Sequence, residues 1–137
     1  MPLFSQESMS KLSTCHEDLQ KIFYEVVRTF DCAILQGYRN EEDQNTDFSS
    51  GKSKLQWPNS KHNTKPSLAV DVSPYPIPNW DDTKDFVYFA GYVMGTAAKL
   101  FADGKIGHMP VWGGDWNNNK RTGDEDFCDY THFQLDL

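Results

Sequence analysis

Basic charge, long apolar runs and paired cysteines are all scarce in this chain of 137 residues. It has 13 lysine and arginine residues against 20 acidic ones, which gives a formal net charge of −7. A general nucleic-acid binder needs a basic surface, so the charge argues against that class. It also argues against electrostatic adhesion to an anionic membrane. No segment approaches the roughly 20 apolar residues of a transmembrane helix, so no membrane anchor is expected.

The three cysteines, Cys15, Cys32 and Cys128, have no paired or Cys-x-x-Cys spacing. An odd number without such spacing is typical of reduced thiols in a cytosolic protein. Cys128 precedes Asp129 directly, which leaves open a role as a thiolate ligand or nucleophile.

Residues 1–7 have no basic segment followed by an apolar one, so no signal peptide is expected. The protein is therefore expected to be made in a cytoplasm and to stay there unless it is released.

Internal repeats, low-complexity tracts and linkers are absent as well. Residues 1–137 are expected to form one domain, because a division would leave each half too small to bury a useful core. Hydrophobic residues make up 38% of the chain and aromatic residues 14%, as in a packed globular protein. Residues 40–66 are polar with little periodicity, and a loop of that length in a compact domain is usually functional or mobile.

Apolar periodicity predicts two helices and several short strands. Apolar residues recur at three- and four-residue steps through residues 8–30, and again from residue 81 or 82 to about residue 101. Short apolar segments predict strands at residues 32–39, 68–72, 109–112 and 131–137. The order of these elements has no regular strand–helix–strand repeat, so an α+β domain is expected.

Two histidines and one aspartate have the residue types of a metal site. His62 lies in polar sequence without the apolar neighbours of a core residue, and His132 lies on the last predicted strand. Asp71 alternates with apolar residues on the strand at 68–72, so its side chain faces away from the apolar layer. Three N and O ligands leave one position of a tetrahedral zinc open for water, as in catalytic sites. Asp129 offers the free acid that metal-assisted hydrolysis needs.

Residue types alone leave other interpretations open. A half-buried strand histidine that bonds to backbone is common, so His62 or His132, each taken alone, is more often structural than a ligand. His16 lies on the first predicted helix and is expected at the surface. His108 follows Gly107 in a turn and is a weaker ligand candidate.

Several short motifs occur in a characteristic order. They are Gln36-Gly37-Tyr38-Arg39, Ser60-Lys61-His62, Ala69-Val70-Asp71, Trp-Gly-Gly-Asp-Trp-Asn at residues 112–117 and Asp129-Tyr130-Thr131-His132. This order resembles zinc peptidases that cut peptidoglycan stem peptides, namely the VanX/VanY-type D-alanyl-D-alanine peptidases and the phage L-alanyl-D-glutamate endolysins. Length and order are most similar to the single-domain phage endolysins. The resemblance implies a Hedgehog/D-Ala-D-Ala peptidase-like fold, with a small antiparallel sheet and two main helices.

The resemblance also implies roles for individual residues. Zinc would be bound by His62, Asp71 and His132, and Asp129 matches the family's general base. Arg39 matches the arginine that helps to hold the substrate or polarises the scissile carbonyl. Three further residues match positions that contact substrate or support the ligands, and these are Gln36, Ser60 and Asp115.

Two features depart from a simple match. Eight residues separate His62 from Asp71, whereas the family usually has six. The extra residues fall in the turn-like segment 63–67, which can bulge without moving either ligand. In a regular strand Asp129 and His132 would point to opposite faces. A turn is therefore expected between them, with the strand beginning near Thr131.

The function implied is zinc-dependent hydrolysis of peptidoglycan stem peptides at the L-Ala–D-Glu bond, by a phage endolysin in host lysis. D-Ala-D-Ala carboxypeptidase or dipeptidase action is the alternative within the same chemistry. A non-catalytic, zinc-stabilised binding module of the same fold, or a cytosolic protein without metal, also stays open. The layout implies a monomeric catalytic domain without a cell-wall-binding domain, made in the host cytoplasm and acting on the wall after release.

Overall fold

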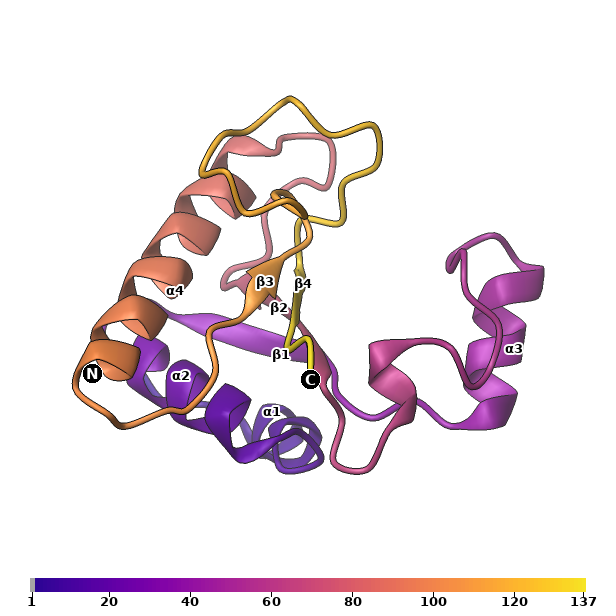
Figure 1. The fold of residues 1–137 in the computed structure, drawn as a ribbon, viewed down its shortest axis with the longest axis horizontal. Helices are drawn as coiled ribbons and strands as arrows, with labels where there is room; N and C mark the ends of the chain where they lie inside the picture. Colours follow the sequence, from indigo (N-terminus) through magenta and orange to yellow (C-terminus); the bar gives the residue numbers. More distant parts are fainter. Residues whose placement is uncertain (1) are drawn as a thin grey trace.

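Four short antiparallel strands form the centre of the structure, a computed structural model that describes residues 2–137 (Figure 1). They are β1 (Cys32–Gln36), β2 (Ala69–Pro74), β3 (Val111–Trp112) and β4 (His132–Gln134). The strand order in the sheet is β1-β2-β4-β3, so the last strand of the chain pairs with β2. The expected α+β class and small antiparallel sheet are confirmed, although each strand has different bounds from those expected.

Two helices supply most of the apolar core beside this sheet. In α2 (Glu17–Val27) one face is fully buried, and α4 (Lys84–Ala102) packs against both α2 and β2. The ring of Phe23 from α2 meets that of Phe133 from β4 edge to face, with 5.3 Å between ring centroids. The helices thereby fix the strand that carries His132.

The helix expected at residues 8–30 is in fact two helices. α1 (Gln6–Leu12) ends before Ser13, and α2 begins at Glu17. Between them Thr14 O accepts the N–H of Ser67, and Ser67 O accepts the N–H of His16. These backbone bonds to a distant segment replace helical ones, while the apolar spacing continues across the break. His16 caps α2, because its Nδ1 atom accepts the Asp18 N–H at 3.0 Å.

The polar segment 40–66 also has helical structure, contrary to the expected irregular loop. α3 (Glu41–Ser49) begins after Asn40, whose side chain accepts the N–H of Asp43. A 3₁₀ turn, η1 (Lys61–Asn63), follows further along. Figure 1 shows α3 on an arm that stands away from the sheet and the other helices. α3 itself has one apolar residue, Phe48, which explains why periodicity did not reveal the helix.

The cysteines of residues 2–137 are all free thiols, as expected. Cys15 and Cys32 are buried, and burial raises the pKa of each thiol to about 12, which leaves both unreactive at neutral pH. Cys128 is partly exposed.

Among residues 2–137, no helix is long and apolar enough to cross a membrane.

Candidate metal centre and active-site cleft

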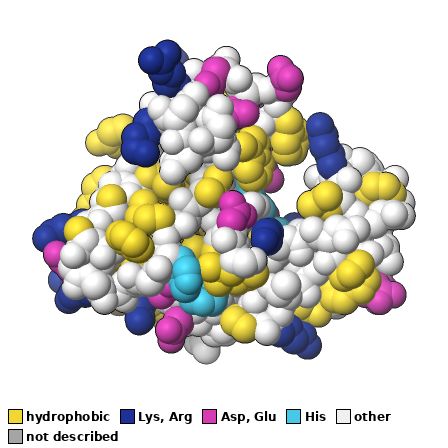
Figure 2. All heavy atoms as spheres, viewed as in Figure 1, with side chains coloured by type: hydrophobic (Ala, Val, Ile, Leu, Met, Phe, Trp, Pro, Cys, Tyr) yellow, Lys and Arg dark blue, Asp and Glu magenta, His cyan; other side chains and the backbone are white. Residues whose placement is uncertain are grey.

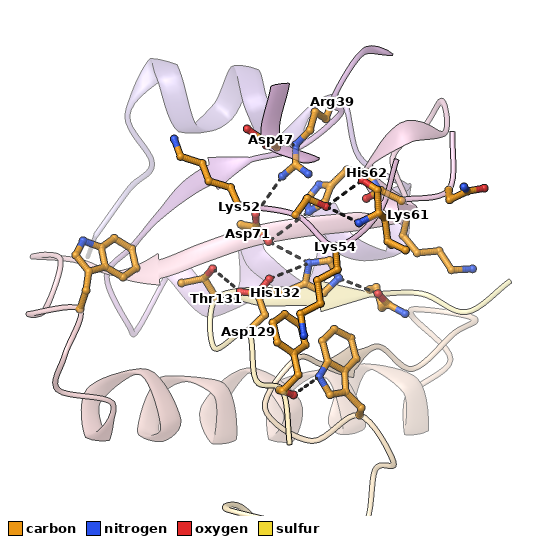
Figure 3. A pocket seen from close by; sticks show the side chains of 18 residues that line it. Arg39, Asp47, Lys52, Lys54, Lys61, His62, Asp71, Asp129, Thr131 and His132 are labelled. Carbon is orange, nitrogen blue, oxygen red and sulfur yellow. Dashed lines mark hydrogen bonds and ion pairs between the residues drawn. The ribbon is translucent and has the colours of Figure 1, made fainter. Parts of the chain in front are cut away.

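The sheet brings two of the predicted metal ligands into direct register. Asp71 of β2 pairs with His132 of β4, and the third candidate, His62, comes from η1 (Figure 3). One ligand atom from each residue lies within 4.8 Å of the other two. Three residues far apart in sequence therefore form one compact donor group.

Hydrogen bonds orient the imidazole of His62. Its Nδ1 atom lies 2.7 Å from the carbonyl oxygen of Gly37, which can only accept, so Nδ1 carries the ring proton. The neutral ring then has a lone pair on Nε2, which is buried, has no hydrogen-bond partner and lies 3.3 Å from Asp71 Oδ1. A buried lone pair facing a carboxylate oxygen is unfavourable unless a cation or proton lies between them.

The Ser-x-His motif has a structural explanation in η1. Ser60 Oγ accepts the N–H of His62, and Asn63 Oδ1 accepts the N–H of Ser60, which forms a capping box. The carbonyl oxygen of His62 accepts the N–H of Arg39 at 2.8 Å. Ser60 therefore lies at the cleft and supports the backbone that presents His62.

His132 repeats the arrangement of His62 with its two nitrogens exchanged. Its Nε2 atom lies 2.8 Å from Gln134 Oε1, and the amide nitrogen of Gln134 donates to Asp136 at 2.7 Å. Gln134 is thereby turned to accept from Nε2–H. The Nδ1 atom of His132 faces Asp71 Oδ1 at 3.2 Å. In each imidazole, one nitrogen is held by an oxygen acceptor, Gly37 O or Gln134 Oε1, and the other nitrogen faces the carboxylate of Asp71.

The carboxylate of Asp71 is held in its charged form. Burial alone would raise its pKa, but the neighbouring His62 and His132 outweigh burial and hold the pKa of Asp71 well below its ordinary value. For His132, burial would lower the pKa, and the hydrogen bond and charge of Asp71 raise it above the usual value. The group therefore favours a positive charge between its members.

These observations fit a divalent zinc ion. Two imidazole nitrogens and one carboxylate oxygen are typical zinc donors in a site with an open fourth position. In each histidine, the nitrogen that does not face Asp71 donates its N–H to an oxygen, of the Gly37 backbone or of the Gln134 amide. Metal-binding histidines are usually held in this way. The site thus has both the donors and the supporting contacts that such an ion requires.

Asp129 lies beside the donor group rather than in it. Its Oδ2 atom is 4.0 Å from His132 Nδ1, because the chain turns before β4 and the N–H of His132 donates to Asp129 O. The turn expected between these residues is present. Burial and the charge of Asp71 raise the pKa of Asp129 above its ordinary value. A carboxylate with a raised pKa is a better proton acceptor.

The Trp-Gly-Gly motif fixes this turn. Gly113 O accepts the N–H of Asp129, and Gly113 N–H donates to His132 O, each at 2.8 Å. A Cβ atom on Gly113 would overlap the carbonyl oxygen of Asp129. Glycine is required here because the backbone of the loop approaches the backbone of the turn so closely.

Arg39 is buried at the edge of the donor group. Its Nε atom lies 3.2 Å from Asp47, one terminal nitrogen donates to Gln44 at 3.0 Å, and the other is 3.8 Å from Asp71. Asp47 and Gln44 both belong to α3 and were not among the predicted site residues. The asparagine cap and acidic first turn at residues 40–43 were the signals that could have revealed this helix.

The donor group lies at the floor of a cleft of about 1120 Å³. Figure 2 shows the surface hollowed between the arm that carries α3 and the rest of the molecule. Trp116 and Phe127 form part of the wall away from α3, where their rings stack and the indole N–H donates to Phe127 O. A polar floor between partly apolar walls suits an extended peptide.

The remaining predicted site residues lie outside this cleft. Gln36, on β1, donates its side-chain amide to Tyr38 O at 3.1 Å. Asp115 is buried and accepts the N–H groups of Asn119 and Lys120. Asp115 therefore holds the loop that follows β3, and neither residue lines the cleft.

A sequence model of the phage L-alanyl-D-glutamate peptidase family matches residues 2–136. The chain belongs to this family. The sequence-based resemblance to the phage peptidases is thus confirmed, and with it the prediction of an enzyme that cleaves peptidoglycan. No curated protein sequence matches the chain.

A solved structure supports the fold of this phage peptidase family member. The L-Ala D-Glu endopeptidase ChiX of Serratia marcescens superimposes with a TM-score of 0.72 at 23% sequence identity. The similarity covers 98% of this chain and 91% of that one. The expected peptidase-like fold is therefore confirmed over nearly the whole chain.

A second histidine–aspartate group lies elsewhere in this peptidase. Donor atoms of His16, Asp18 and His108 also lie within 4.8 Å of one another. Here Nδ1 of His16 accepts the Asp18 N–H, so its proton is on Nε2. Asp18 Oδ2 accepts from Gly107 N and faces His108 Nδ1 at 2.9 Å. These contacts satisfy the group without a metal, and they join α2 to the turn at Gly107.

Proposed function

We propose that this protein is a zinc-dependent endopeptidase that hydrolyses the L-Ala–D-Glu bond of peptidoglycan stem peptides. Its role would be that of a monomeric phage endolysin, made in the host cytoplasm and acting on the cell wall after release. The observation that carries the proposal is the pair of buried imidazoles whose ring nitrogens face Asp71 Oδ1 at 3.3 and 3.2 Å, with Asp129 beside them.

His62, Asp71 and His132 would hold the zinc ion. When bound there, zinc supplies Lewis acidity, which polarises the scissile carbonyl and lowers the pKa of a water molecule. Gly37 O and Gln134 Oε1 keep the imidazoles in the required tautomers. The residues of the chain therefore provide a preorganised site before substrate arrives.

Asp129 is assigned as the general base. It would take a proton from the attacking water and return it to the leaving amine, because its carboxylate lies beside the donor group, 4.0 Å from His132 Nδ1. Arg39 is assigned to stabilise negative charge that develops on the carbonyl oxygen. Its contacts with Gln44 and Asp47 hold the guanidinium in place, so little reorganisation is needed during the reaction.

The test combines metal analysis with product analysis. Protein purified without added zinc is examined by mass spectrometry, and its digest of purified peptidoglycan is examined for new amino termini. The proposal expects about one zinc per chain and new termini on D-Glu, with L-Ala left on the glycan. Free D-Ala as the only product would assign the protein to the carboxypeptidases. Bound zinc without any cleavage would indicate a binding module.

A further inference from the structure

Positive charge is concentrated in one part of this acidic protein. Residues 48–70 contain four lysines and no acidic residue, although the net charge of the chain is −7. Three of the four line the active-site cleft, namely Lys52, Lys54 and Lys61. In the view of Figure 3 they surround Asp71 and the two candidate histidine ligands. The fourth, Lys65, lies outside the cleft with its ammonium over the ring of Tyr38.

The three cleft lysines have no carboxylate partner. Among residues 2–137, none of them forms an ion pair within 4.0 Å, whereas Lys11 and Lys99 pair with acids one helical turn away. Of the acids at the cleft, Asp47 pairs with Arg39 and Asp71 faces the histidines, and Asp129 lies 4.0 Å from His132 Nδ1. The lysine charges are therefore free to meet an anionic ligand.

Lys54 already reaches across the cleft. Its ammonium lies over the ring of Phe127 on the opposite wall, 4.2 Å from the ring centroid. An exposed contact of this kind is weak, so a carboxylate can displace it readily. The contact shows that Lys54 reaches the space between the two walls.

The wall that carries Lys54 is anchored to the catalytic residues through Gln44, which is fully buried. The side-chain nitrogen of Gln44 donates to Ser53 Oγ at 2.9 Å and to Leu55 O at 2.6 Å, on both sides of Lys54. Its oxygen accepts from Arg39 and from Asn63. The backbone at Lys54 is thus held at a fixed place relative to Arg39 and the turn that presents His62.

The substrate of the proposed reaction carries a charge at the right place. D-glutamate, on the leaving side of the scissile bond, has two carboxyl groups, and only one of them can continue the peptide chain. The other is an anion within one residue of the bond that breaks. We propose that Lys52, Lys54 and Lys61 bind this free carboxylate and make the enzyme selective for stem peptides in which it is not amidated.

This inference rests on the proposed function, and the experiment separates the two. Two soluble stem peptides are compared, one with the free carboxylate on D-Glu and one with the corresponding amide. The wild-type enzyme should cleave the acid with about tenfold higher kcat/KM, mainly through a lower KM, since each partly exposed charge pair contributes up to about fivefold. Salt should weaken this preference because it screens the charges.

The variants Lys54→Gln and Lys52→Gln/Lys54→Gln should lower kcat/KM for the acid more than for the amide, so that the ratio of the two values falls toward one. Lys21→Gln, an exposed change on α2 away from the cleft, should alter neither rate. Equal cleavage of acid and amide by the wild type, or equal loss of both rates in the lysine variants, would overturn the inference alone. Failure of the wild type to cleave the L-Ala–D-Glu bond in either peptide and in peptidoglycan would overturn the proposed function.

Discussion

The Nε2 atom of His62 lies 3.3 Å from the Oδ1 atom of Asp71, and each of these atoms presents a lone pair to the other. His132 Nδ1 approaches the same oxygen at 3.2 Å. Such an arrangement is stable only with a positive charge among the three atoms. A metal ion meets that requirement at neutral pH without protonating both rings.

Replacement of a ligand should therefore abolish tight zinc binding. His62→Ala or His132→Ala removes one of three donors, and the bound zinc should fall from about one per chain to well below that ratio. Mass spectrometry of the purified variants measures it. His108→Ala is the matched control, because this exposed histidine belongs to the other histidine group and should leave the zinc content unchanged. Undiminished zinc in the His62 variant would show that the ligand set is wrong.

Asp129→Asn should keep the zinc and the fold but lose most hydrolysis. An amide cannot accept a proton at neutral pH, and a general base typically contributes about 10²–10⁴-fold. The measurement is turnover of purified peptidoglycan beside zinc content and thermal unfolding. Asp103→Asn, at the exposed end of α4, should retain full activity. Turnover near that of the wild type in the Asp129 variant would remove this residue from its assigned role.

Gln44→Met should reduce both stability and kcat. The substitution keeps the side-chain length but removes the hydrogen bonds of Gln44 with Asn63 and with Leu55 O, at a total cost of about 1–3 kcal/mol. It also releases Arg39 from one of its contacts, so kcat should fall by about tenfold. Urea unfolding and steady-state kinetics measure the two effects. Gln6→Met, at the exposed start of α1, provides the control.

The stability of the contact between α2 and Gly107 should depend on pH through Asp18. Burial would raise the pKa of Asp18, but the hydrogen bonds from His108 and Gly107 outweigh it and hold the pKa below the ordinary value. The charged form is thus favoured in the folded state, so its contribution is present above about pH 4 and is lost as the pH falls through the lowered pKa. Asp18→Asn should lower the free energy of unfolding at pH 7 by about 1–3 kcal/mol, and the difference should shrink below pH 4. A difference that stays constant down to pH 2.5 would contradict this assignment.

Gly37→Ala should destabilise the protein, whereas Gly95→Ala should not. A Cβ atom on Gly37 would overlap Lys11 O and the side chain of Thr14, and Gly37 O is also the acceptor for His62. On α4, a Cβ atom on Gly95 meets nothing within 4 Å, so alanine should stabilise the helix by up to about 1 kcal/mol. Thermal unfolding of both variants tests the pair, and equal Tm values would refute the steric argument.

The sequence predicted the parts of the site that depend on short motifs and on the alternation of side chains between the two faces of a strand. Asp71 faces away from the apolar layer of β2 as expected, and the turn between Asp129 and His132 is present. The motif order predicted that His62, Asp71 and His132 would lie together, which they do. Their role as zinc ligands stays a prediction until the metal is measured.

The parts that could not be predicted depend on contacts between distant segments. The break between α1 and α2 follows from backbone bonds to Ser67, which no local pattern reveals. α3 is polar on nearly all sides, so apolar periodicity missed it, and with it Gln44 and Asp47. Asp115 shares a motif with the family, but its hydrogen bonds point into its own loop rather than into the cleft.

The pairing of Asp71 with His132 has an evolutionary consequence. Their separation is set by the register of two neighbouring strands, while His62 and the cleft lysines lie on segments outside the sheet. Eight residues separate His62 from Asp71, two more than the sequence resemblance implies, yet the three donors still meet. Insertions or charge changes in the cleft walls can therefore occur without a change in the strand register that sets Asp71 against His132. The proposed carboxylate-binding lysines can change in this way, whereas His62 and Arg39 lie on the same walls and must keep their positions.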